Sequence, residues 1–222
     1  MITKISPLSK MLLLSIGFSM ALLLVRVIYA DSLDYSFYIW NSFLAAIPYA
    51  ISTQIAVRKK LDLLTACLLI LWLLYFPNAP YMITNIFHYE KRFPVPFWYD
   101  LILVIIGAWN GMILGMASLM NVEKFLSQHL KTFWVTLCEF FSLLLCSYGI
   151  FIGRFLRFNS WDVVSDPGSL LYTSAHHVLV PQNYAKLWAF TLLFAALLGL
   201  IYFTLKKLPL ILAAKNKQDP GK

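Results

Sequence analysis

The side chains best suited to chemistry in this sequence follow a pair of prolines. In FPNAPYMITNIFHYE, residues 76–90, the prolines interrupt an apolar run, and each removes a backbone donor. Four polar residues with helical spacing come next, namely Asn78, Tyr81, Asn85 and His88. On an α-helix these four share one face. Amide, phenol and imidazole groups on one face can hold a polar ligand, and His88 would be the ligand or proton acceptor.

Two interpretations of this stretch remain open. In both, we expect Asn78 to cap a new helix, with Pro80 inside its first turn. The first interpretation is an amphipathic helix that lies in the membrane interface with its polar face toward water. The second is a broken helix whose free backbone groups, around Leu73 to Phe76 and after Asn78, face an outward cavity, as in transporters.

A lone carboxylate, Glu139, lies in the apolar segment 133–153. At 1.5 Å per residue it is about 9 Å from the start of that segment. An intramembrane carboxylate is by default a proton or ion site. Because no basic partner is evident in a neighbouring segment, the alternative is that Glu139 is protonated or reaches the interface. The sequence does not decide between them.

Further charged residues are expected to gather on the outer face: Asp100, Arg154, Arg157 and Asp162. We expect Asp100 to pair with Arg154 or Arg157, and Asn78 or His88 to line the same depression. Arginine binds phosphate and carboxylate groups bidentately, so an anionic lipid or a small anionic ligand is a candidate partner at this face. The alternative is a belt of ion pairs that fixes helix ends.

No metal, cofactor or catalytic residue is predicted. His176 and His177 are adjacent, and His88-x-Glu90 lacks the i, i+4 spacing of a helical zinc motif. The sequence also has no phosphate-binding glycine loop and no nucleophile elbow.

A stripe of small residues marks the segment 98–120. Gly107, Gly111 and Gly115 recur every four residues, which lets helix backbones approach closely in a membrane. We expect the partner to be the segment 133–153. Asn110 borders the stripe, and an interhelical hydrogen bond is favoured there over a ligand contact.

The composition defines the elements that must position these groups. The chain has 222 residues, of which 60% are hydrophobic and 13% charged, and its mean hydropathy is +0.73. These values predict an all-α, polytopic membrane protein of one domain, 1–222. Continuous apolar runs exclude a barrel and predict a six-helix transmembrane bundle with short interfacial helices on its outer face. The expected spans are 11–29, 37–57, 61–76 with a broken extension to 88, 98–120, 133–153 and 187–205.

The distribution of Lys and Arg predicts the orientation. With a cytoplasmic amino terminus, five basic residues lie outside and twelve lie inside: Lys4, Lys10, Arg58, Lys59, Lys60, Lys124, Lys131, Lys206, Lys207, Lys215, Lys217 and Lys222. Both termini are therefore expected in the cytoplasm. The net charge of +8 has the same origin and does not imply nucleic acid. A retained first helix with Arg26 snorkelling outward is favoured over a cleaved signal peptide.

Three segments together carry a family resemblance: FPNAPYMITNIFH, FWYDLILVIIGAWNG and GRFLRFNSWD. They resemble a family of bacterial membrane proteins catalogued as domain of unknown function thirteen sixty-one. The likeness covers Leu61 to Asp162. It implies a multi-pass protein of a bacterial inner membrane and carries over no site residue.

Three classes of function fit these patterns. Transport or lipid handling requires a cavity that extends past Asn78 toward Asn110 or Glu139. A structural or accessory membrane subunit requires helices that are packed solid. A membrane-embedded hydrolase or transferase requires His and acidic side chains within metal or acid–base reach.

Overall fold

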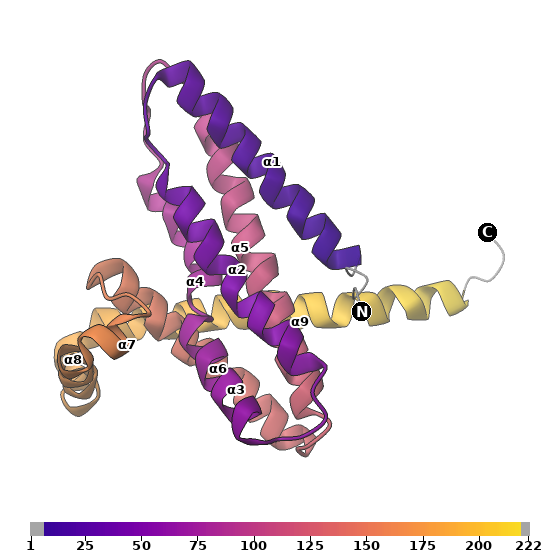
Figure 1. The fold of residues 1–222 in the computed structure, drawn as a ribbon. Coiled ribbons are helices and arrows are strands. Elements are labelled where there is room, and N and C mark those ends of the chain that lie inside the picture. Colours follow the sequence, from indigo (N-terminus) through magenta and orange to yellow (C-terminus); the bar gives the residue numbers. More distant parts are fainter. Residues whose placement is uncertain (1–6, 219–222) are drawn as a thin grey trace. The chain divides into compact units, whose positions relative to one another are not determined.

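The computed structural model describes residues 7–218, and every regular element in them is a helix. Two residues of the charge count, Lys4 and Lys222, lie outside the described residues, as do the side chains of Lys215 and Lys217. The chain falls into two compact units, 1–125 and 126–222 (Figure 1).

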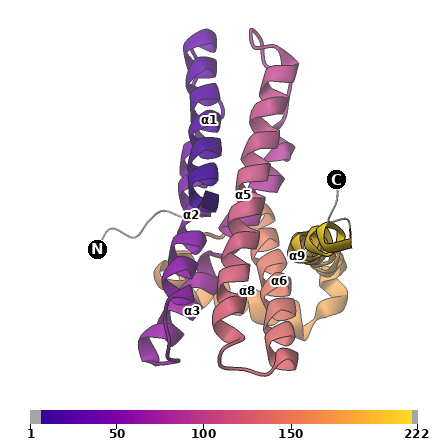
Figure 2. The same cartoon turned by 90° about the vertical axis from the view of Figure 1, so that its right-hand side faces the viewer.

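The first unit is built from five helices and one 3₁₀ helix: α1 (Pro7–Ala30), α2 (Phe37–Ala56), α3 (Leu63–Tyr75), α4 (Asn78–Tyr81), η1 (Met82–His88) and α5 (Phe97–Leu126). Helix α2 packs against α3, α4 and η1. Helix α1 is hydrogen-bonded to α5 along its length through Ser15, Ser19 and Arg26, and the two helices lie side by side in Figure 2. The core of this unit contains Leu23, Tyr35, Tyr38, Met82 and Leu103.

The second unit contains α6 (Thr132–Phe155), α7 (Asp162–Ser165), α8 (Pro167–Leu179), the 3₁₀ helix η2 (Pro181–Tyr184) and α9 (Ala185–Gln218). Helices α6 and α9 pack against each other. Helix α8 begins where Asp166 accepts a hydrogen bond from the Ser169 amide at 3.2 Å and where Pro167 occupies the first turn, which tolerates proline.

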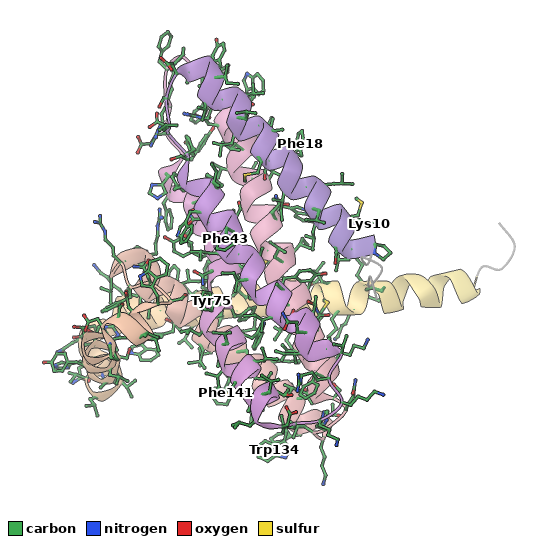
Figure 3. All side chains as sticks on the ribbon, viewed as in Figure 1. Lys10, Phe18, Phe43, Tyr75, Trp134 and Phe141 are labelled. Atoms are coloured by element: carbon green, nitrogen blue, oxygen red, sulfur yellow. The ribbon has the colours of Figure 1, made fainter. Side chains whose placement is uncertain are left out.

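Five helical segments among the described residues are long and apolar enough to cross a membrane: 7–30, 63–88, 97–126, 132–155 and 181–209. Helix α2 forms as expected but is not among them, and Pro48 lies inside it. Aromatic side chains such as Phe18 and Phe141 are exposed on the outside of these helices, and Phe43 is exposed on α2 (Figure 3). Such exposure of large apolar groups is typical of a surface that faces lipid.

The chain after α3 bends less abruptly than the sequence predicts. Phe76 and Pro77 both keep right-handed helical angles, and one α-helical turn, α4, leads into η1. The prediction that Asn78 caps a new helix is wrong. The Ala79 amide bonds to the Phe76 carbonyl, three residues back, and the Asn78 side-chain amide donates to the Tyr75 carbonyl at 3.0 Å. The Asn78 side chain therefore supplies a hydrogen bond to the helix backbone at the break.

Candidate functional site

The pitch of η1 rearranges the polar face expected from the sequence. In a 3₁₀ helix, residues three apart lie above one another, so Asn85 aligns with Met82 and His88, whereas Tyr81 aligns with Thr84. Asn85 is fully buried, with its Oδ1 3.5 Å from the Asn41 amide. His88 is exposed, and its ring packs on Phe37 at 5.0 Å. The four residues Asn78, Tyr81, Asn85 and His88 therefore do not form one face.

A buried ion pair joins α1 to α5 at one end of the first unit. Arg26 donates to both carboxylate oxygens of Asp100, from Nε at 2.7 Å and from Nη2 at 3.2 Å, and each side chain is 1% exposed. Its Nη1 also donates to the Asp34 carbonyl at 3.2 Å. The prediction that Arg26 snorkels outward is therefore wrong.

Asp100 takes Arg26 as its partner in place of the expected Arg154 or Arg157. Both residues of the observed pair lie about one turn from their helix ends, where a desolvated carboxylate and a guanidinium can meet. The sequence did hold a signal, because an arginine inside an apolar run either snorkels to the interface or pairs with a buried group of opposite charge. The separation of 74 residues hid which acid it was.

Tyr35 lies between this pair and a second arginine. Its ring centroid is 4.6 Å from the Arg26 guanidinium carbon and 4.9 Å from that of Arg92. Its hydroxyl donates to the His88 carbonyl at 3.1 Å, and its φ of 66° places the backbone in the left-handed region. Burial, followed by the Asp100 charge, raises the pKa of Tyr35, so its phenol stays neutral and keeps donating.

Arg92 completes the group. Its Nη1 is 3.1 Å from Asp34 Oδ1, and its Nη2 is 4.0 Å from Glu90 Oε2. We call Arg26, Asp34, Tyr35, Arg92 and Asp100 the Arg26 cluster. It combines one buried and one partly exposed ion pair, and the guanidinium groups of both pairs lie over the Tyr35 ring. The Arg92 half was missed by the sequence reasoning.

A groove of about 260 Å³ lies directly beside the Arg26 cluster. It is lined by Val25, Arg26, Tyr29, Val95, Pro96 and Tyr99. Tyr99 is fixed there because its hydroxyl donates to the Leu22 carbonyl at 2.8 Å. The lining is apolar apart from the guanidinium and phenol groups, so the groove suits a hydrocarbon chain that carries a polar end.

The glycine stripe of α5 packs closely, as predicted, but against another partner. A methyl group at Gly111 would overlap the Ala79 carbonyl oxygen and Met82, and one at Gly107 would overlap Tyr38. The stripe therefore faces α2, α4 and η1. The backbone at the break after α3 comes so close to α5 that only residues without side chains fit there, and the glycines provide that space. The prediction that these glycines pack against segment 133–153 is therefore wrong.

The interhelical hydrogen bond predicted for Asn110 is confirmed. Its Oδ1 accepts from Ser15 Oγ at 2.5 Å, and its Nδ2 donates to Ser19 Oγ at 3.4 Å. Neither Asn110 nor Asn78 lines the groove. Both side chains are occupied by hydrogen bonds inside the bundle.

In the second unit, Glu139 has the basic partner that the sequence did not reveal. Its Oε1 accepts from Lys206 Nζ at 3.0 Å and from the Tyr202 hydroxyl at 3.1 Å, while its buried Oε2 has no hydrogen-bond partner among the described residues. The last expected span, 187–205, ends one residue before Lys206. Helix α9 continues to Gln218, which puts Lys206 on the helix face that meets α6.

The other charged candidate residues of the second unit do not form one site through the contacts of the described residues. Asp162 accepts from the Asn159 amide at 2.6 Å and from Ser165 Oγ at 3.0 Å, and so stabilises its own turn. Arg154 lies in the last turn of α6, and Arg157 is exposed with a φ of 63°.

His177 is buried, which the sequence did not predict. Its Nδ1 lies 3.0 Å from the Tyr148 hydroxyl, which also donates to Ser174 at 3.0 Å. Burial, and then the neighbouring His176, lowers the pKa of His177. Among the described residues, no group of three His, Cys, Asp or Glu side chains could hold a metal ion.

Long apolar helices with lipid-type exteriors and a dry ion pair between two of them define a multi-pass helical membrane protein. The family described as "Protein of unknown function (DUF1361)" matches residues 40–201, and the chain belongs to that family. The match extends beyond the likeness seen in the sequence to most of α2 and the first half of α9. No curated protein and no solved structure matches the chain.

Proposed function

We propose that this protein handles phospholipid at the outer face of a bacterial inner membrane, which it crosses six times with both termini in the cytoplasm. The observation that carries the proposal is the groove beside the Arg26 cluster. Its volume of about 260 Å³ is close to the lower end of ordinary ligand pockets, about 300 Å³. A groove of that size suits the upper part of one acyl chain, with the headgroup remaining at the rim.

The position of the groove supports lateral entry from the bilayer. Val25 and Tyr29, which line it from α1, are 55% and 64% exposed on a helix of the membrane-spanning type. Arg26 lies in the groove wall but is held in its ion pair and is 1% exposed. The groove therefore offers a lipid a mainly apolar wall, with the polar end of the lipid outside it.

Passage through the bundle is less well supported. The close packing at Gly111 and the hydrogen bonds of Asn78 and Asn110 occupy the route that a central pathway would need. The same packing favours a structural or accessory subunit as the second candidate. In that case lipid at the groove would be ordinary bilayer lipid without preference.

Crosslinking with a phospholipid that carries a photoreactive group on its acyl chain tests the proposal. Purified protein in nanodiscs should be labelled mainly within 25–29 and 95–99. Val25→Trp, which fills the groove, should reduce this labelling several-fold. Leu14→Trp is the matched control, because Leu14 is 70% exposed on the same helix and lies outside the groove. Labelling that is even along α1 and α5, or equal in the two variants, would favour the accessory subunit.

A further inference from the structure

Opposite charges lie side by side around Arg92, three residues before Val95 in the groove wall. Arg92 is held between Asp34 at 3.1 Å and Glu90 at 4.0 Å. The three side chains are 27%, 45% and 69% exposed in that order, so each has a side that remains open to a ligand. We infer that the groove takes a zwitterionic aminophospholipid, whose phosphate binds Arg92 and whose primary ammonium binds Asp34 and Glu90. This inference rests on the proposed function.

A tight turn connects this charged group to the groove wall. The Val95 amide donates to the Arg92 carbonyl at 3.0 Å, and Val95 and Pro96 line the groove. The ends of such a turn lie within about 7 Å of each other. The residue proposed to bind the phosphate and the residues that line the groove therefore belong to one turn of the chain.

Arg92 is preorganised for a phosphate. Its guanidinium stacks on Tyr35, at 4.9 Å from the ring centroid, and Tyr35 is held in turn by its hydrogen bond to the His88 carbonyl. Stacking leaves the edge of the guanidinium plane for hydrogen bonding, and that edge matches two phosphate oxygens.

The balance of charge selects the headgroup. One guanidinium between two carboxylates repels a headgroup that brings only negative charge. A phosphoethanolamine headgroup avoids that repulsion, because its ammonium takes the place of Arg92 at Asp34 while its phosphate takes the place of Asp34 at Arg92. The exchange therefore leaves the number of ion pairs the same with the lipid bound as without it. A choline headgroup has no N–H donor for the carboxylates and is expected to bind more weakly.

Competition among lipids with identical acyl chains tests the inference. The full chain, purified in mild detergent, is mixed with phosphatidylethanolamine, phosphatidylglycerol and phosphatidylcholine, and the lipids retained are quantified by native mass spectrometry. The wild type should retain phosphatidylethanolamine several-fold over both others. Asp34→Asn with Glu90→Gln should reverse the order in favour of phosphatidylglycerol. The Asp34 carbonyl that binds Arg26 is unchanged in this variant.

Arg92→Gln should weaken retention of phosphatidylethanolamine and phosphatidylglycerol alike. Lys91→Gln removes the same charge from the exposed neighbouring residue and should leave the order unchanged. Equal effects of these two variants, or a wild type that prefers phosphatidylglycerol, would overturn the inference while leaving the groove result for Val25→Trp intact. Displacement of the lipid by millimolar free phosphoethanolamine would show a soluble ligand in place of a lipid. If the wild type retains no lipid and crosslinks evenly, the proposed function itself fails.

Discussion

Removing one charge of the buried ion pair should destabilise the protein strongly. In Asp100→Asn the guanidinium of Arg26 would keep its position, 1% exposed, without a counter-charge. Breaking a buried pair in this way costs about 3–5 kcal/mol. Since folded domains are stable by only about 5–15 kcal/mol, the variant should lose a large fraction of its free energy of unfolding.

Equilibrium unfolding in mixed micelles, followed by tryptophan fluorescence, measures the loss. Asp34→Asn is a matched control, because it makes the same substitution in an ion pair whose side chains are 27% and 45% exposed. Such pairs contribute about 0–1 kcal/mol. The double variant Arg26→Met/Asp100→Leu should recover most of the stability, since it leaves no charge to bury. The reasoning is refuted if Asp100→Asn loses no more than Asp34→Asn, or if the double variant is as unstable as Asp100→Asn.

Two further outcomes are expected. Gly111→Ala should destabilise the fold by about 1–3 kcal/mol, because its methyl group meets the Ala79 carbonyl. Gly17→Ala, whose methyl group meets nothing within 4 Å, should stabilise the fold by up to about 1 kcal/mol. Thermal unfolding in detergent compares the two variants. Because the pKa of folded His177 is below its ordinary value of 6.5, stability should be full above that pH and fall as the pH drops from 6.5 toward the folded-state pKa. His177→Phe should flatten this dependence, as read from unfolding midpoints between pH 5 and 8.

Each of these has its own contrary result. Equal midpoints for the two glycine variants would mean that α5 has room to move away from α4. An unchanged pH profile in His177→Phe would assign the dependence to other groups, and His176→Phe at the exposed neighbouring position provides the comparison.

The features predicted correctly from the sequence are those that a local pattern of residues determines. Apolar runs located the helices, and the two prolines located the break after α3, because both signals act on the residues that carry them. The spacing of Gly107, Gly111 and Gly115 predicted close approach of another backbone. It did not identify that backbone, because a stripe describes one helix and not its neighbour.

The sequence did not reveal which charged residues form ion pairs, because the partners lie far apart along the chain. Arg26 meets Asp100 across 74 residues, and Glu139 meets Lys206 across 67. No periodicity links residues so far apart. The 3₁₀ geometry of η1 could not be predicted for a related reason. A 3₁₀ helix has intrinsically poor hydrogen bonds, so η1 is stabilised by contacts with distant residues. These are the packing of Met82 against Gly111 and the hydrogen bond from Tyr35 to the His88 carbonyl.

The same 74 residues have a consequence for biosynthesis. Residues are added at about 5–20 per second, so several seconds pass between the synthesis of Arg26 and that of Asp100. During that interval the guanidinium has no carboxylate to join, and an arginine without one stays with the headgroups and water. We therefore expect helix α1 to reach its final depth only after the first turn of α5 has been made. A chain released before Asp100 would leave its first helix in a shallower position, and quality-control proteases would find an exposed arginine where the finished protein has none.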